Sequence, residues 1–163
     1  MLILISKKTT KKMILLIAVA LMAFVPFIAN THAAKASQNN DQSEKLIQVG
    51  KKELGKPYRW GATGPHSFDC SGFTKFVYKH SISKNLPRTA QAQYNNSKKV
   101  SSNDLQKGDL VYFGSSKHSI SHVGMYIGHG KMIDAQNRGV VTEKVHAPWW
   151  HLVSCSRPAN LNH

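Results

Sequence analysis

Two cysteines are the residues of this 163-residue chain that could most directly act as nucleophiles. Cys70 lies in the stretch DCSGF, residues 69–73, where a helix is expected to begin, and Cys155 lies in a predicted terminal strand. Three interpretations of Cys70 are open: a reactive thiol, one half of a disulfide with Cys155, or a small apolar core residue. A reactive thiol also requires a base, which must be a histidine elsewhere in the chain.

The residues around Cys70 favour a helix whose first residue is the cysteine. Asp69 is a preferred N-cap residue, and Phe68 and Phe73 occupy the two positions of a hydrophobic staple. At the first helical position, unpaired backbone N–H groups and the helix dipole favour a thiolate. Gly72 disfavours the helix by about 0.5–1 kcal/mol relative to alanine, and one reason to tolerate it is the close approach of another backbone or a substrate.

His122 stands apart from the other histidines because it begins the most regular predicted strand, HVGMYIG. It shares a strand face with Gly124 and Tyr126, so a rigid strand would present its ring beside a small residue. The equally weighted alternative is that His122 is an ordinary surface histidine on a half-exposed strand.

The turn GHG, residues 128–130, would join this strand to the next one, KMIDAQ. A three-residue loop with Gly130 in the left-handed conformation pairs Ile127 with Lys131 and continues to His122 opposite residue 136. This register brings either Asp134 or Gln136 to the face of His122, where a carboxylate or an amide could hold the imidazole.

The rest of the chain predicts an α+β domain. A helix is expected from Ser43, a Gly- and Pro-rich loop carries Tyr58 and Trp60, and a short helix follows Pro87. Short β-branched or aromatic segments after Asn103 predict strands separated by turns. Helices first and strands second indicate an antiparallel sheet with helices packed on it.

The first 36 residues have the layout of a secretory signal peptide. Lysines precede an apolar run over residues 13–29, and small residues permit cleavage after Ala33 or Ala36. Retention as an amino-terminal anchor is the alternative. Export predicts a secreted or cell-envelope protein of a bacterium, periplasmic or outside the cell, with no stable membrane insertion after cleavage.

The expected domains are the signal peptide over 1–36, a short spacer over 37–42 and one domain over 43–163. Without the five lysines of the first segment, 17 of the 22 basic side chains remain against 8 acidic ones, a formal charge of +9. Such a surface would attract anionic polymers, and export favours those of a bacterial wall over nucleic acid. A basic surface without a dedicated partner is an equally weighted interpretation.

Several spaced motifs together resemble the NlpC family of papain-like cysteine peptidases. They are PYRWG, DCSGF, LPRTAQAQY, GDLVYF, and HVGMYIG followed by GKMIDA, spread over about residues 43–157. The resemblance implies a papain-like α+β fold with the nucleophile at a helix N-terminus, packed on an antiparallel sheet. It implies hydrolysis of peptidoglycan stem peptides, typically between γ-D-glutamate and a diamino acid, by a monomer that needs no cofactor or metal.

By the same resemblance, Cys70 is the nucleophile and His122 the general base. Tyr58 matches a tyrosine that helps to stabilise the oxyanion. Asp69 and Ser71 match positions that contact the amino end of the substrate peptide in some members. Arg88, in the LPRT segment, matches a structural or cleft-lining position.

One position departs from the family pattern. The third catalytic residue is usually histidine, with asparagine or glutamine in some members, and this chain has Asp134 there. A carboxylate accepting from the imidazole Nδ1–H would raise the basicity of His122 and favour a thiolate–imidazolium pair; Gln136 is the fallback. The resemblance also weighs against the disulfide, which would occupy the nucleophile, and leaves Cys155 as a lone buried cysteine.

Two other functions fit the same residues. One is a catalytically impaired module that binds the cell wall. The other is a different enzyme on the same scaffold, such as a peptidoglycan amidase or acyltransferase.

Overall fold

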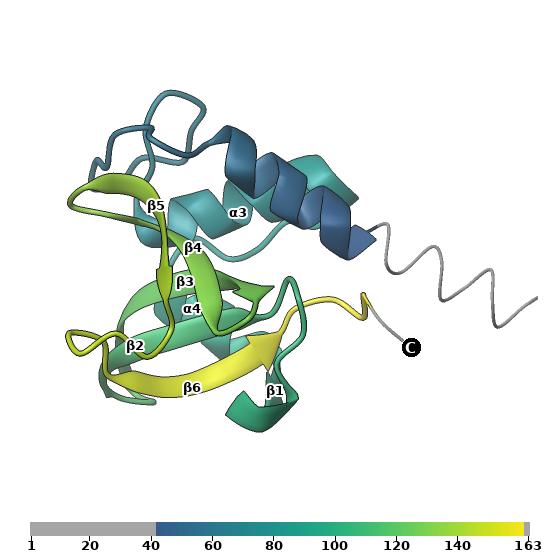
Figure 1. Ribbon diagram of the computed structural model, residues 1–163, viewed down its shortest axis with the longest axis vertical. Helices are drawn as coiled ribbons and strands as arrows, with labels where there is room; N and C mark the ends of the chain where they lie inside the picture. Colours follow the sequence, from purple (N-terminus) through teal and green to yellow (C-terminus); the bar gives the residue numbers. More distant parts are fainter. Residues whose placement is uncertain (1–41, 162–163) are drawn as a thin grey trace, which may run out of the picture. The chain divides into compact units, whose positions relative to one another are not determined.

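The computed structural model describes residues 42–161 of the chain (Figure 1). The predicted signal peptide, its cleavage sites at Ala33 and Ala36, and most of the spacer lie outside the described residues. The helix expected from Ser43 covers residues 42–52, so Ser43 lies inside it. It is followed by α3 (Cys70–Ile82), α4 (Ala90–Asn95) and the short 3-10 helix η1 (Ser102–Asp104). Within residues 42–161, no helix has the length and apolar composition of a membrane span.

Six antiparallel strands form one sheet, which confirms the predicted α+β class. Along the sheet their order is β1-β6-β2-β3-β4-β5. Their bounds are β1 (Lys98–Val100), β2 (Leu110–Ser116), β3 (Ser119–Gly128), β4 (Lys131–Gln136), β5 (Gly139–Lys144) and β6 (Leu152–Arg157). Strand β1 was not among the predicted strands, and it pairs with β6 over three residues.

Each face of the sheet carries its own apolar cluster, because successive strand residues point to opposite faces. Tyr112, Met125 and Ile133 belong to the cluster that includes the buried residues of α3. Val111 and Phe113 belong to a second cluster that contains no residue of α3. Both α3 and α4 contact the central strand β3 (Figure 1).

The strand order requires the segment between β5 and β6 to cross the sheet. Strand β5 lies at one edge, whereas β6 lies beyond β4, β3 and β2. The crossing segment, residues 145–151, is tied to the sheet at both ends: Val145 N donates to Gly130 O at 2.9 Å, and Gly114 N donates to His151 O at 3.2 Å. Trp150 of this segment contacts Phe113 on β2 and His122 on β3.

The β3–β4 hairpin reaches the predicted register by a different turn. Met125 pairs with Ile133 as expected, but Lys131 pairs with Gly128 and not with Ile127, because the ladder is irregular between Tyr126 and Gly128. The turn has two residues, His129 and Gly130, both with positive φ (53° and 67°). Such a turn is typical of tight hairpins. One fewer loop residue and one extra strand residue cancel, so the register beyond the irregularity is unchanged.

Helix α3 begins as predicted. Asp69 is its N-cap and accepts from Gly72 N at 2.7 Å, which makes Cys70 the first helical residue. The Phe68 and Phe73 rings meet edge to face with centroids 5.8 Å apart, as a hydrophobic staple requires. Gly72 admits a backbone: a Cβ at this position would lie 2.1 Å from the Ala62 carbonyl oxygen.

Replacing Gly72 with alanine is therefore expected to destabilise the protein, although alanine is the better helix former. The clash is with a backbone oxygen that accepts from Asp69 N at 2.9 Å, so the loop cannot move without losing that bond. We expect a loss of about 1–3 kcal/mol in the free energy of unfolding, measured by urea denaturation. The control is Lys79→Ala on the exposed part of α3, expected to change it by less than about 0.5 kcal/mol. A Gly72→Ala variant as stable as wild type would contradict this explanation.

Candidate active site

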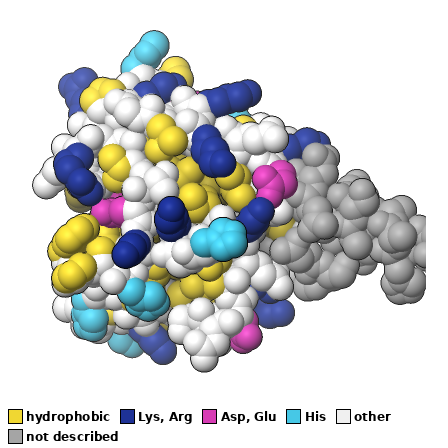
Figure 2. Space-filling view, in the orientation of Figure 1, with side chains coloured by type: hydrophobic (Ala, Val, Ile, Leu, Met, Phe, Trp, Pro, Cys, Tyr) yellow, Lys and Arg dark blue, Asp and Glu magenta, His cyan; other side chains and the backbone are white. Residues whose placement is uncertain are grey.

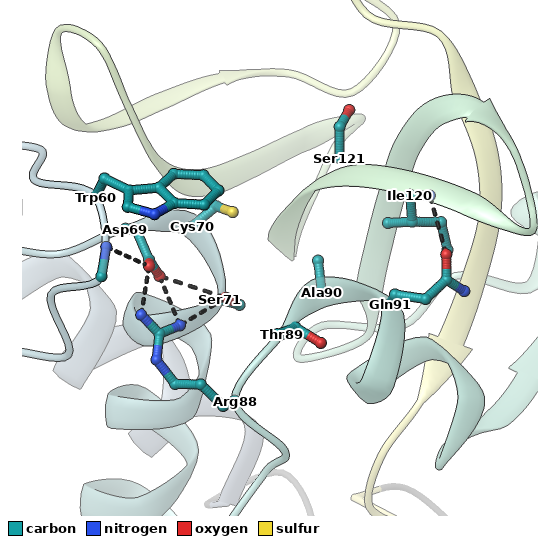
Figure 3. A pocket seen from close by; sticks show the side chains of 11 residues that line it. Trp60, Asp69, Cys70, Ser71, Arg88, Thr89, Ala90, Gln91, Ile120 and Ser121 are labelled. Carbon is teal, nitrogen blue, oxygen red and sulfur yellow. Dashed lines mark hydrogen bonds and ion pairs between the residues drawn. The ribbon is translucent and has the colours of Figure 1, made fainter.

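Cys70 lies at the edge of an open cleft of about 460 Å³ (Figure 3). The residue is 8% exposed, and its sulfur points toward the cleft beside the ring of Trp60. The cleft runs between the start of α3 and the segments around α4 and the start of β3. It is lined by Trp60, Gly61, Asp69, Cys70, Ser71, Arg88, Thr89, Ala90, Gln91, Ile120 and Ser121. A nucleophile with this placement is accessible to an extended substrate in the cleft.

His122 lies on β3 between Cys70 and a buried carboxylate. Its Nε2 is 2.8 Å from Asp134 Oδ2, and the Cys70 side chain lies close enough to act on the pKa of the ring. The expectation that Asp134 binds Nδ1 is wrong: the carboxylate holds Nε2, which leaves Nδ1 as the nitrogen for Cys70. Gln136, the fallback partner, lies outside this set, and its Oε1 accepts from the backbone N–H of Arg138 at 3.4 Å.

The surroundings of His122 favour its protonated form. Burial alone would lower the pKa of His122, but hydrogen bonds with Asp134 and with Cys70, and the charges of both, outweigh burial and raise it to about 9. Asp134 is fully buried, and burial raises the pKa of this carboxyl, while the hydrogen bond from His122 opposes that rise. The imidazolium is therefore stabilised by an acceptor on each side.

Asp69 and Arg88 form an ion pair on the floor of the cleft (Figure 3). Arg88 donates to both carboxylate oxygens of Asp69, with Nη1 3.1 Å from Oδ1, and also to Ser71 Oγ at 3.0 Å. Asp69 in addition accepts from the backbone N–H of Gly61 at 3.0 Å. The hydrogen bond with Asp69 raises the pKa of Arg88, so this guanidinium stays charged. The pair fixes the loop before α3 to the segment before α4.

Tyr58 lies close enough to Cys70 and Asp69 to respond to their charges. Burial is the main factor that raises the pKa of Tyr58, followed by the charges of Cys70 and Asp69. Its hydroxyl therefore keeps its proton and can donate a hydrogen bond near the nucleophile. The tyrosine is positioned by an isolated bridge between its backbone and that of Phe68.

The disulfide interpretation of Cys70 is wrong, because both cysteines are free and buried. Cys155 lies on β6, where burial, assisted by the charge of Asp109, raises the pKa of its thiol to about 11. It stays a neutral thiol at ordinary pH. Within residues 42–161, no group of three or more His, Cys, Asp or Glu side chains is placed to hold a metal ion.

Two tryptophans of the site were not predicted from sequence. Trp60 is 84% exposed and forms one wall of the cleft. In the stretch PYRWG, the family resemblance gives a role near the nucleophile to Tyr58 but none to Trp60. Trp150 stacks on His122, with centroids 4.4 Å apart and planes at 10°. Its contact depends on the crossing of residues 145–151, which follows from the strand order and from no local motif.

A thiol at the N-terminus of a helix that packs on an antiparallel sheet, with a strand histidine beside it, defines the papain-like class of α+β folds. A model of the NlpC/P60 family matches residues 55–156, more than half of the chain. The chain belongs to the NlpC/P60 family, which confirms the family resemblance and the fold class predicted from sequence.

Named relatives support this assignment. The chain is 44% identical over 126 residues to "Probable endopeptidase p60" of Listeria grayi, covering 74% of this chain and 24% of that protein. It is 38% identical over 123 residues to "Bifunctional muramidase/DL-endopeptidase CwlT" of Bacillus subtilis, covering 72% of this chain and 37% of that protein. The matched part of this chain therefore spans only 24% to 37% of the length of these two relatives.

Among solved structures, the fold is similar to that of an NlpC/P60 family protein from Bacillus cereus. The TM-score is 0.68 and the sequence identity 38%, over 71% of this chain and 40% of the other.

Proposed function

We propose that this chain is a cysteine endopeptidase that hydrolyses peptidoglycan stem peptides, at the bond between γ-D-glutamate and a diamino acid. The observation that carries the proposal is the set of three side chains, with His122 hydrogen-bonded to Asp134 and close to Cys70, which borders an open cleft. Relatives named as endopeptidases support the reaction class. Cys70 is the proposed nucleophile, His122 the general acid and base, and Asp134 its orienter.

In the proposed reaction, the Cys70 thiolate attacks the carbonyl carbon of the scissile amide. The imidazolium of His122 gives its Nδ1 proton to the leaving amine as the C–N bond breaks, which leaves a thioester on Cys70. Neutral His122 then takes a proton from water, whose oxygen attacks the thioester carbonyl. Release of the carboxylate product regenerates the thiolate and the imidazolium.

The oxyanion that forms in both steps requires hydrogen-bond donors. As the first residue of α3, Cys70 contributes a backbone N–H from the helix terminus, where such groups have no intrahelical partner. The Tyr58 hydroxyl, kept protonated by its surroundings, is the second proposed donor.

Asp69 and Ser71 are the proposed contacts for the amino end of the substrate peptide, because both line the cleft beside Cys70. The carboxylate of Asp69 already accepts from Arg88, Gly61 and Gly72, so a substrate ammonium group would add to these bonds. Arg88 offsets part of the charge of Asp69 and is proposed to keep the carboxylate oriented.

Peptidoglycan is the proposed physiological partner, reached after export by the predicted signal peptide over residues 1–36. Lys and Arg side chains are spread over the face shown in Figure 2, with few acidic ones among them. Attraction to anionic wall polymers is proposed to assist targeting, and binding to isolated walls should then weaken with rising salt.

The test is a digest of purified peptidoglycan by the chain from Ser37 onward, beside its Cys70→Ala variant. Walls that contain diaminopimelate and walls that contain lysine are both used, and products are identified by mass spectrometry. A new amino-terminal diamino acid that is absent with the variant supports the proposal. Release of free glycan from intact peptides would indicate an amidase, and wall binding without any product would indicate a binding module.

Replacing Trp60 with alanine is expected to weaken substrate binding more than catalysis. Trp60 forms an exposed wall of the cleft and has no proposed part in the chemistry, so its loss removes apolar contact area. We expect KM to rise about tenfold or more with kcat changed less than about threefold, measured on a soluble stem peptide. Trp149→Ala is the matched control, because Trp149 is also exposed (66%) but does not line the cleft. An equal effect of the two changes would contradict a role of Trp60 in binding.

A further inference from the structure

The imidazole of His122 is covered on one side by an aromatic residue from a distant part of the chain. The indole of Trp150 lies 4.4 Å from it, centroid to centroid, with the two planes only 10° apart. The ring of Phe113 on β2 packs against this indole, with the two ring centroids 4.9 Å apart, and its centroid lies 5.9 Å from that of the imidazole. Parallel stacking at this distance places the electron-rich indole face against the ring that carries a positive charge in the thiolate–imidazolium pair.

The indole is held in this plane by a hydrogen bond at its other end. Trp150 Nε1 donates to Glu143 Oε1 at 2.8 Å, and the second carboxylate oxygen of Glu143 accepts from Arg138 Nη2 at 3.2 Å. Only 7% of the Glu143 side chain is exposed, so this acceptor is fixed by packing as well as by charge. Three elements thus meet behind His122: β5, the turn before it, and the crossing segment over residues 145–151.

We propose that Trp150 is a positioning residue of the active site: anchored by Glu143, its indole stabilises the imidazolium of His122 and keeps Nδ1 directed at Cys70. The expected effect of Trp150 on turnover rests on the proposed peptidase function, but its effect on the formation of the Cys70 thiolate does not. The charged or titratable groups around His122 are Cys70 from α3 and Asp134 from β4, with Glu143 of β5 facing Asp134. Phe113 from β2 and Trp150 itself do not titrate.

The test measures how fast uncharged iodoacetamide alkylates Cys70 at each pH, read by mass spectrometry on the Cys70 peptide. Trp150→Leu keeps an apolar cover over His122 but removes the aromatic face. A destabilised imidazolium holds the thiolate less well, so the thiolate forms only at higher pH. We expect the midpoint of alkylation to rise by about 0.5–1 pH unit in Trp150→Leu, and Trp150→Phe, which restores a ring face, to regain most of that shift.

A second pair of variants tests the anchor without altering the ring. Glu143→Gln and Glu143→Ala both remove the carboxylate charge, but only glutamine keeps an acceptor for the indole N–H. We expect Glu143→Ala to show a lower kcat than Glu143→Gln by about threefold or more, with similar KM. This pair also keeps the proposal testable if Trp150→Leu fails to fold, which thermal melting would show.

The results separate this inference from the proposed function. Unchanged alkylation in a folded Trp150→Leu variant, with equal kcat for the two Glu143 variants, would overturn the role of Trp150 while leaving the peptidase proposal intact. Alkylation whose pH midpoint depends on Trp150, without any peptidoglycan cleavage, would support the inference and overturn the peptidase proposal. A wild-type Cys70 that does not react with iodoacetamide, in a protein that releases no peptide from peptidoglycan, would overturn both.

Discussion

Replacing Cys70 with alanine is expected to abolish peptide release from peptidoglycan while leaving the fold intact. The change removes the only atom of the site that is proposed to bond covalently to the substrate. In hydrolases with a nucleophile and a histidine base, loss of the nucleophile lowers kcat by a factor on the order of 10⁴–10⁶. We expect a loss of this order for Cys70→Ala, measured as the rate of new amino groups in a digest.

Cys155→Ala is the matched control for this change. Cys155 is the other buried free cysteine, it lies on β6, and its raised thiol pKa keeps it uncharged at neutral pH. Its replacement should leave turnover within about twofold of wild type, since it has no proposed part in the chemistry. Substantial turnover by Cys70→Ala, or a loss in Cys155→Ala equal to that in Cys70→Ala, would contradict the assignment of the nucleophile.

Replacing Asp134 with alanine is expected to have the second largest effect. The change removes the acceptor 2.8 Å from His122 Nε2, so the ring is free to turn Nδ1 away from Cys70 and loses the charge that favours its protonation. Loss of the orienting carboxylate in comparable hydrolases lowers kcat by a factor on the order of 10²–10⁴. Asp134→Asn, which keeps an acceptor of the same shape, should lose less.

Asp134→Asn also predicts a change in pH dependence. With a folded-state pKa of about 9, His122 is protonated at neutral pH, and activity should fall as the pH rises through about 9, where the proton for the leaving amine is lost. Asparagine removes the negative charge that raises this pKa while the burial that lowers it remains. The high-pH limb of kcat/KM should therefore move to lower pH, by about one unit or more.

Gln136→Ala is the control for the Asp134 variants. Gln136 follows Asp134 on β4 by two residues, but its side chain accepts from the backbone of Arg138, outside the set around His122. Its activity and pH profile should match those of wild type. If Gln136→Ala moved the high-pH limb and Asp134→Asn did not, the orienter would have been misassigned.

The start of α3 could be predicted from sequence because its signals are local. Asp69 caps the helix through the backbone N–H of Gly72, and the staple of Phe68 and Phe73 spans six residues. These contacts form within one or two turns of chain, so DCSGF and the residue before it contain them all. The same is true of the α+β class, which follows from the order of the helical and strand patterns.

The register of the β3–β4 hairpin was predicted correctly, although its turn was not. The observed turn is one residue shorter than the predicted loop, and the irregular part of β3 contains one extra residue. The two differences cancel, so Met125 still pairs with Ile133. Which nitrogen of His122 meets Asp134 could not be derived in this way. The register places two side chains on one face, but the direction of the ring depends on Cys70 and on Trp150, which come from other elements.

The support behind His122 was beyond the reach of sequence reasoning. Trp150 reaches the imidazole only because β6 lies beyond β2 in the sheet and the chain must cross over to it. The pairing of Arg88 with Asp69 likewise joins residues that are 19 positions apart on separate segments. Both contacts depend on the packed structure, and the sequence separation of the residues gives no sign that they meet.

The most direct test of the central claim is to look for the thioester on Cys70. The chain is mixed with a soluble stem peptide containing γ-D-glutamate and a diamino acid, quenched in acid during turnover, and mapped by peptide mass spectrometry. The proposed mechanism predicts a Cys70 peptide heavier by the acyl portion of the substrate, which neutral hydroxylamine removes and which is absent from a His122→Ala sample quenched at the same time. Turnover with no adduct on Cys70, under conditions that trap one in a known thiol hydrolase, would contradict it.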